Sequence, residues 1–589
     1  MSPLARQLVD FLRTRPPQSA REACAFLGVS QPVFSRLVAS LGTQVLTLGK
    51  ARRTRYAARR EIPGVGDRCV LYEIDAAGSS RRAATLHAVG AGGFVVESEV
   101  AEIQSAHFQD LPYFLDGMRP AGFLGRRVPK QHPDLDLPAD VRHWSADHCL
   151  RYLARWGWNT PGAFVIGDEA FRLYLKHAKA PPVVVPMARR RHEYPRLAHA
   201  ALEGAPPGSS AGGEQPKFLV HRAPGPVEVL VKFSPPADDP TTRRHADLLV
   251  AEHLAHRVLQ SHGRRACRSE LVFADGRVFL EVERFDRLPA GGRRGVLSLF
   301  ALDAEFAGRM KSWSDSAETL ASQAVIDQAA LGEVQWLELF GGLIANSDMH
   351  PANLSFFATG ARPEELAPAY DMLPMRYSPR DGQQLRVDFE PPLPSPRDAP
   401  HFADARIVAC ELWRRVAKHD AVSDDFRAIA AQNEAKLAAL AGLEKKLPKA
   451  QRPVARTLGG SHASPGVRAR DSGDLSMVSA AGDFLGTETG AAAAETSEVI
   501  PCSAQSGAGR ATSGVPVVSE CRFSILILTR SARPRVARLR CIARMPSRSR
   551  DDARHEAFSR ATTSALVRWS KRAPGVSSEA RKTHGMREA

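Results

Sequence analysis

Apolar residues recur every three or four positions at the start of the chain, which predicts a helix over residues 3–14 that two prolines end. Ser19 and Ser30 are placed to cap a second and a third helix, and Gly28 supplies the turn between them. Two short strands around a basic turn follow. Three helices and a hairpin in this order are typical of a winged helix-turn-helix domain, which we assign to residues 1–60.

The pattern beyond this module predicts a small sheet. Residues 67–98 alternate apolar and polar positions around glycine-rich turns, which predicts antiparallel strands. Helical spacing follows at 143–156 and 168–177. We assign the sheet and the first of these helices to a subdomain at residues 61–165.

Residues 166–455 combine short strands with long helices. The predicted strands span 217–220, 227–233, 271–273 and 278–282. The predicted helices span 244–260, 322–345, 402–418 and 424–441. Strands first and helices afterwards predict a two-lobed α+β body.

The last part of the chain, residues 456–589, changes composition. It is rich in Ala, Ser, Gly, Thr and Arg and holds only four aromatic residues. Burial of so few large side chains does not offset the chain entropy, so we predict a basic, low-complexity and disordered tail. One apolar run at 524–528 is able to pair or aggregate. Whether the tail is functional or an out-of-frame extension stays open.

Charge is concentrated at the two ends of the chain. The chain has 80 Lys and Arg against 64 Asp and Glu, and residues 1–60 carry a net +9, as does the tail. A small, strongly basic module is typical of nucleic-acid binding, whereas a winged helix that binds protein is the alternative. The expected DNA contacts are Gln31, Ser35 and Arg36 on the third helix and Lys50, Arg52, Arg53 and Arg55 on the hairpin.

Two further features of the sequence indicate the cellular location of the protein. No stretch approaches the roughly 18 to 20 apolar residues of a membrane span, and the N-terminus lacks the apolar core of a signal peptide. The eight cysteines include no CxxC pair, so neither a zinc site nor a disulfide framework is indicated. We therefore predict a cytoplasmic protein with reduced thiols and no membrane partner.

Three segments of the body carry the residue types that phosphoryl transfer requires. The first is glycine-rich, PPGSSAGGEQPKF at 206–218, where glycines let backbone N–H groups approach phosphate oxygens and Lys217 follows. In the second, Lys232 lies inside an apolar strand pattern, where an ammonium group needs a partner. Glu252, on the next predicted helix, is the candidate partner, and a lysine that reaches solvent is the alternative.

The third segment, GGLIANSDMHPANLSFF at 341–357, is the most specific. Asp348 and Asn353 are five positions apart, as are the catalytic aspartate and the metal-binding asparagine of protein kinases, although His350 here follows the aspartate. Asp371 comes later in an apolar, strand-like context and is suited to hold Mg²⁺. Taken together with the glycine-rich loop and Lys232, these residues predict a kinase site.

These motifs resemble the HipA-type serine/threonine protein kinases of bacterial toxin-antitoxin systems. The similar stretches are SAGGEQPK, VERFDR, NSDMHPANLS and AYDMLP, and the resemblance covers residues 65 to 445. The stretch LPYFLDGMRPAGFLGR, preceded by a winged helix, is more specifically similar to the YjjJ-like branch, in which a DNA-binding module is fused to the kinase.

The resemblance implies a kinase-like two-lobed fold, ATP and Mg²⁺ as cofactors, and Asp348 as catalytic base. Asn353 and Asp371 would hold the metal, and Ser209 or Ser210 would be autophosphorylated. The acceptor would be a translation protein such as an aminoacyl-tRNA synthetase, with an antitoxin and a second copy of the chain as further possible partners. The residues implied to bind the nucleotide are Gly212, Gly213, Gln215, Lys217, Lys232, Glu252, Glu283, Phe285 and His350.

Two other classes of function stay open. A small-molecule phosphotransferase would use the same Asp348 and Asn353 chemistry on a different acceptor. A DNA-binding transcription regulator with an inactive kinase body is the alternative without catalysis.

Overall fold

The computed structural model divides the chain into two compact units, Met1–Leu458 and Gly459–Ala589, which are described separately. The residues that it describes are 1–180, 182–203, 215–358, 360, 362–380, 382–383 and 387–443, together with the strands 519–527 and 535–543.

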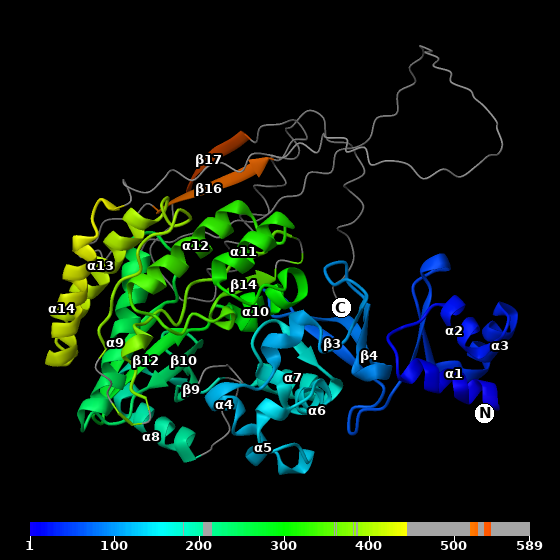
Figure 1. Cartoon of the computed structure of the whole chain (residues 1–589). Helices are drawn as coiled ribbons and strands as arrows, with labels where there is room; N and C mark the ends of the chain where they lie inside the picture. The colour runs from blue at the N-terminus through cyan, green and yellow to red at the C-terminus, as the bar shows by residue number, and fades with distance from the viewer. Residues whose placement is uncertain are drawn as a thin grey trace, which may run out of the picture. The chain divides into compact units, whose positions relative to one another are not determined.

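The N-terminal module consists of three helices and a hairpin, in the order that the sequence predicts (Figure 1). Ser19 caps the second helix through a reciprocal bond with Glu22, and Gly28 ends it with φ +64°, a left-handed conformation that glycine adopts readily. Leu8, Leu12 and Phe34 are buried where the helices meet. The elements are α1 (Pro3–Arg13), α2 (Ala20–Leu27), α3 (Gln31–Leu41), β1 (Val45–Leu48) and β2 (Arg55–Ala58).

The middle region contains a five-stranded antiparallel sheet in the order β6-β5-β4-β3-β7. Its strands are β3 (Arg68–Ile74), β4 (Ser80–Ala88), β5 (Phe94–Ser98), β6 (Ala106–Phe108) and β7 (Phe164–Ile166). Its helices are α4 (Gly122–Gly125), α5 (Val128–Gln131), α6 (Ala146–Trp156) and α7 (Asp168–Lys179). β7 pairs with β3, and α7 packs against α6 and β7, so the sheet subdomain extends past the predicted boundary at residue 165.

The next region is a second five-stranded sheet, in the order β11-β12-β10-β9-β8, with helices on both faces. Tyr194 of α8 packs on Phe218 and Phe279 at one face, and α9 packs against β12 at the other. The elements are β8 (Val184–Val185), α8 (Arg190–Glu203), β9 (Lys217–Arg222), β10 (Val227–Phe233), α9 (Pro240–Ser261), β11 (Ser269–Ala274) and β12 (Arg277–Glu283).

The helical lobe follows, and its α13 and α14 lie side by side (Figure 1). Three tryptophans, Trp313, Trp336 and Trp413, are buried in its core. The elements are β13 (Gly295–Ser298), α10 (Leu299–Leu302), α11 (Trp313–Ser322), α12 (Gln328–Leu343), β14 (Ser355–Ala358), β15 (Glu365–Leu366), α13 (Phe402–Lys418) and α14 (Asp424–Ala439). Strands before helices confirm the predicted α+β fold.

The single helix predicted over 322–345 is wrong at its start. Residue 322 is the last residue of α11, Ala324 adopts a left-handed φ of +55°, and Asp327 then caps α12 by accepting a 2.7 Å hydrogen bond from Ala330 N. Apolar residues continue across the break, which is why the periodicity did not reveal it.

The prediction of a tail without regular structure is wrong for two segments. β16 (Ser519–Ile527) and β17 (Arg535–Ala543) form an antiparallel pair, and β16 contains most of the apolar run noted in the sequence. Alternating residues in both segments and pairing of their backbones favour strands there.

Among the described residues no single helix is long and apolar enough to cross a membrane. Within the same residues, only α2 and the segment Gln31–Gln44 are together long and apolar enough, and these two are bent by 100° relative to each other.

Candidate active site

Three charged side chains from three separate segments meet at the face of the second sheet. Lys232 of β10 lies 2.6 Å from Glu252 Oε1 of α9 and also contacts Asp371 Oδ1. Lys232 is 5% exposed and Glu252 is fully buried, whereas the Asp371 side chain is 29% exposed. The structure therefore brings together the expected lysine and glutamate, and it adds the expected metal-binding aspartate.

The electrostatics of this cluster favour a charged lysine. Burial alone would lower the pKa of Lys232, but Asp371 and Glu252 outweigh burial and hold the pKa above its ordinary value. Burial would raise the pKa of Asp371, and the lysine reverses that effect, so the pKa is lowered. The cluster is thus an ammonium group held between carboxylates, with Asp371 on the more accessible side.

Strand register places a second lysine beside the first. Lys217 of β9 is the direct partner of Lys232 of β10, so both side chains leave the same face of the sheet. Lys217 is buried and lowers the pKa of Asp371 by its charge. This face therefore carries two ammonium groups side by side, the kind of group that binds phosphate oxygens, together with the carboxylates of Glu252 and Asp371.

The loop after α12 carries the predicted catalytic base. The Asp348 side chain is half exposed, and its Oδ1 lies 3.8 Å from His350 Nε2. Asn353 Nδ2 donates a 2.8 Å hydrogen bond to Asp348 O, which closes the loop. The carboxylate therefore points to solvent from a backbone that its own neighbours hold in place.

Asn346 links this loop to the Asp371 segment, and the sequence pattern did not single it out. Its Nδ2 donates to Asp371 O at 3.2 Å, and its Oδ1 accepts from Asp348 N at 3.1 Å. Asn346 is 8% exposed. Its position two residues before Asp348, inside the stretch NSDMHPANLS, is the feature of the sequence that could have indicated this role.

The loop is also braced from the helical lobe by residues that the sequence did not reveal. Trp313 Nε1 donates to His350 O at 3.1 Å, while Trp313 N donates to Glu338 Oε1 at 2.9 Å. Tyr370 donates its hydroxyl proton to Ala352 O at 2.9 Å. The base loop is therefore tied to α11, to α12 and to the segment that carries Asp371.

Asp371 does not lie in a strand, contrary to the prediction. It adopts φ +53°, and the pairing just before it is an isolated bridge between Ala266 and Ala369. Aspartate tolerates the left-handed conformation better than most residues. That conformation lets the chain turn after the bridge and brings the carboxylate to Lys232.

Two further residues expected to bind the nucleotide are Glu283, the last residue of β12, and Phe285, two residues beyond it. Lys232 pairs with Leu280, so the alternating Glu283 side chain leaves the opposite face, where Arg222 binds it. The Glu283 side chain thus points away from Lys232, and the role of Glu283 in nucleotide binding stays a prediction. The ring centroids of Phe285 and Tyr370 are 5.8 Å apart, and Tyr370 directly precedes Asp371 in the chain.

The remaining members of the predicted site divide into two groups. Gln215 is partly buried just before β9, and His350 accepts a 3.2 Å hydrogen bond from Ala352 N through Nδ1. Gly212 and Gly213 and the candidate phosphorylation sites Ser209 and Ser210 lie outside the described residues.

The residues present fit a magnesium ion that is bound together with phosphates. Within the described ranges, no three His, Cys, Asp or Glu side chains form a cage of their own. Mg²⁺ typically takes one or two protein ligands and fills its shell with phosphate oxygens and water. Asn353 directs Nδ2 to the backbone, which leaves its amide oxygen available, and Asp371 uses only Oδ1 on Lys232.

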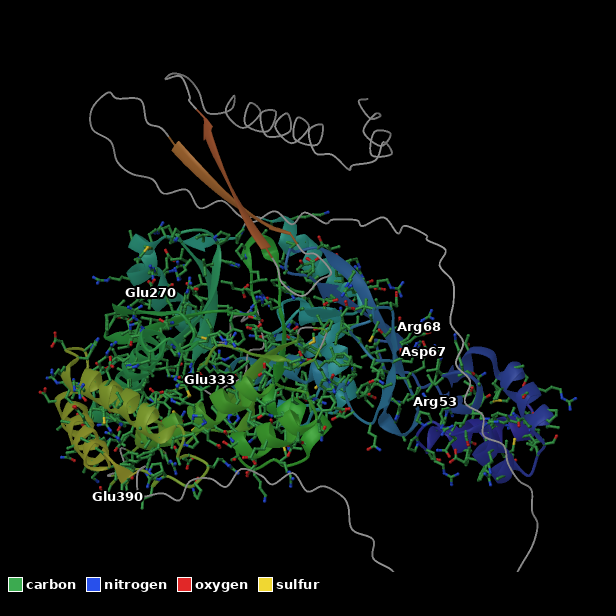
Figure 2. The ribbon with its side chains drawn as sticks, turned by 90° about the horizontal axis from the view of Figure 1, so that it is seen from above. Arg53, Asp67, Arg68, Glu270, Glu333 and Glu390 are labelled. Carbon is green, nitrogen blue, oxygen red and sulfur yellow. The ribbon has the colours of Figure 1, made fainter. Side chains whose placement is uncertain are left out.

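The residues expected to contact DNA are all exposed. On the described part of the chain none of the basic ones forms an ion pair with a carboxylate, and Arg53 is labelled on its hairpin in Figure 2. They are Gln31, Ser35, Arg36, Lys50, Arg52, Arg53 and Arg55. The basic hairpin is thus available for an anionic partner.

Comparisons with known proteins agree with the motifs. A family model described as YjjJ-like toxin, middle domain, matches residues 65–175, and one described as HipA-like C-terminal domain matches 209–438. Toxin YjjJ of Escherichia coli (strain K12) is 35% identical over 438 residues, which cover 73% of this chain and 97% of that protein.

Two solved structures match the chain at low sequence identity and with low TM-scores. A chain of the Shewanella oneidensis MR-1 complex of HipA, HipB and operator DNA matches with a TM-score of 0.40 and 16% identity, over 62% of this chain and 96% of that chain. The Helicobacter pylori proinflammatory kinase CtkA matches with a TM-score of 0.28 and 15% identity, over 39% of this chain and 90% of that chain. The identity to toxin YjjJ over nearly its whole length shows that the chain belongs to the family of HipA-like toxins, in its YjjJ-like branch.

Proposed function

We propose that the chain is an ATP-dependent serine/threonine protein kinase of a toxin-antitoxin system. The observation that carries this proposal is the buried Lys232 between Glu252 and Asp371. Protein kinases use a lysine and glutamate pair to hold nucleotide phosphates and an aspartate to hold the metal. Membership of the HipA-like toxins agrees with this chemistry.

The geometry supports an in-line transfer. Lys232 and Lys217 would hold phosphate oxygens of ATP, and Asp371 with Asn353 would hold Mg²⁺, which neutralises charge on the phosphates. Asp348 would accept the proton of the acceptor hydroxyl as its oxygen forms a bond to the γ-phosphorus. The bond from that phosphorus to the β–γ bridging oxygen breaks at the same time, and ADP leaves.

A protein acceptor fits the exposed position of the base. The Asp348 side chain is half exposed, at a loop rather than at the bottom of a described cavity, so a serine on another protein can reach it. The family resemblance points to a translation protein such as an aminoacyl-tRNA synthetase. A small-molecule phosphotransferase would use the same groups and is the competing outcome of the test.

The test is transfer of the γ-phosphate from Mg-ATP by the full chain, alone and with a cytoplasmic extract, followed by mass spectrometry. We expect label on Ser209 or Ser210 and on one extract protein. Label on small metabolites alone would favour the small-molecule alternative. No transfer, together with no shift in melting temperature on adding Mg-ATP, would contradict the kinase proposal and favour the regulator.

We also propose that the N-terminal module binds DNA. Its exposed arginines Arg52, Arg53 and Arg55 lie on the hairpin after α3, and α3 exposes Arg36. In a winged helix the corresponding helix enters the major groove and the hairpin meets phosphates. Binding near the gene for this protein would couple its expression to its activity.

Reversing charge on the hairpin is expected to weaken DNA binding uniformly across sequences. Arg52→Glu or Arg53→Glu should reduce the slope of log affinity against log salt by about 0.9 for each phosphate that the arginine no longer neutralises, because fewer counterions are released. Fluorescence anisotropy with labelled duplexes between low and moderate salt measures this slope. Arg172→Glu, the same charge change at an exposed position of α7, is the matched control, and an equal effect there would contradict the assignment.

A further inference from the structure

A fully buried histidine lies one helical turn beyond Glu252, and none of the roles assigned above uses it. His256 of α9 is 0% exposed, and no described residue hydrogen-bonds to its Nε2. The second oxygen of Glu252, Oε2, is also buried and lacks a hydrogen-bond partner among the described residues. Leaving two such atoms unpaired costs free energy, so each calls for a partner.

The two atoms belong to the same neighbourhood. Residues four apart on a helix lie on one face, about 5–6 Å apart between Cβ atoms. Lys232 contacts Glu252, and its charge adds to burial in lowering the pKa of His256. A donor on one of the two orphaned atoms would satisfy the acceptor on the other.

The hydrogen bond at His256 Nδ1 determines whether the imidazole proton lies on Nε2, where it could be donated to Glu252 Oε2. Ser269 Oγ lies 3.1 Å from His256 Nδ1 and 3.0 Å from His253 Nδ1. A hydroxyl has one proton to donate, so it can donate to one ring and accept from the other. If Ser269 donates to His256 Nδ1, the imidazole proton lies on Nε2, which is then a buried donor without a described acceptor.

The imidazole is neutral at physiological pH. Burial, followed by the charge of Lys232, lowers the pKa of His256 to about 3. A neutral ring adds no charge to the cluster and can donate through Nε2 without competing with the ammonium group.

We propose that His256 is a positioning residue for the phosphate-binding lysine, which it serves by donating Nε2–H to Glu252 Oε2 across one water. This role rests on the kinase function proposed above. Lys232 contacts Glu252 and Asp371 in the structure, and Asp371 is the residue that would turn to the metal. Once it does, Glu252 is the remaining carboxylate among the described contacts of Lys232, so its orientation decides where the ammonium points.

The experiment compares Mg-ATP and adenosine binding to the full chain by calorimetry. We expect His256→Leu to raise the Kd for Mg-ATP about tenfold and to leave the Kd for adenosine within about twofold, because adenosine has no phosphates. His256→Gln, whose amide can donate a proton, is expected to recover most of the affinity. His245→Leu, the same substitution on the same helix away from Ser269, is the matched control and should bind both ligands like the wild type.

A double-mutant cycle separates positioning from general damage to the lobe. In a Glu252→Gln background, His256→Leu is expected to cause less than about a further twofold loss, since the group that it orients is gone. Additive losses, or equal losses for adenosine and Mg-ATP, would overturn the role of His256. A wild-type chain that binds no Mg-ATP would instead overturn the kinase proposal and this role with it.

Discussion

Asp348→Asn is expected to lower kcat for phosphoryl transfer by about 10²–10⁴-fold, the range for loss of a general base. The amide cannot accept the proton of the acceptor hydroxyl at neutral pH. The Kd for Mg-ATP should stay within about twofold, because the lysines and Asp371 that would hold the phosphates and metal are untouched. Single-turnover transfer from radiolabelled ATP, with calorimetry for binding, measures the two effects separately.

The same substitution should leave the fold intact. The Asp348 side chain is half exposed, and the described hydrogen bonds of the residue use its backbone N and O. Asp420→Asn, at another exposed aspartate, is the control for a change of charge alone. If Asp348→Asn transferred phosphate at the wild-type rate, another group would have to be the base.

Lys232→Met is expected to abolish Mg-ATP binding and to destabilise the protein by about 3–5 kcal/mol, as found when one partner of a buried ion pair is removed. The reason is that Glu252 is fully buried and would lose the cation that compensates its charge. Urea denaturation of the full chain, followed by the fluorescence of the buried tryptophans of the helical lobe, measures the loss.

Removing the carboxylate as well should restore stability without restoring function. Lys232→Met with Glu252→Leu replaces the ion pair by apolar groups of similar size, a change that is often neutral or stabilising. We therefore expect most of the lost stability to return while Mg-ATP binding stays absent. A double variant as unstable as Lys232→Met would contradict this account of the cluster.

The penalty of Lys232→Met should also depend on pH. Burial raises the pKa of Glu252 above its unfolded value, and without Lys232 the group that opposes burial most strongly is gone and only the charge of Lys217 still lowers that pKa. A carboxyl group whose pKa is raised in the folded state favours folding at low pH and loses that contribution as pH rises through the folded pKa. The stability gap to the wild type should therefore be smaller at about pH 5.5 than at about pH 7.5.

Local pattern was sufficient for most elements of the fold. The spacing of apolar residues located α1, α2 and α3, and the pattern at 227–233 located β10. Ser19 caps α2 as predicted, whereas the side chain of Ser30 makes no capping hydrogen bond at the start of α3. It failed between α11 and α12, where a left-handed Ala324 breaks the helix without a change in hydrophobicity. It also failed at β16 and β17, where pairing of two segments supplies a stability that neither segment has alone.

The sequence predicted the residue types of the site but not their arrangement in space. Motif spacing named Lys232, Glu252, Asp348, Asn353 and Asp371, because protein kinases carry these groups for phosphoryl transfer in this order along the chain. The helical spacing of Glu252 and the strand context of Lys232 follow from local sequence in the same way.

Folding alone decided which of these groups meet. Lys232 and Asp371 are 139 positions apart, and their contact depends on the sheet, the bridge at Ala369 and the left-handed turn at Asp371. Asn346 and His256 gained their significance in the same way, since each is an ordinary polar residue until packing places it against the cluster. Such contacts arise from long-range packing, which short-range patterns do not encode. The sequence therefore predicted which residue types carry the chemistry, whereas only the tertiary structure decided how they are arranged.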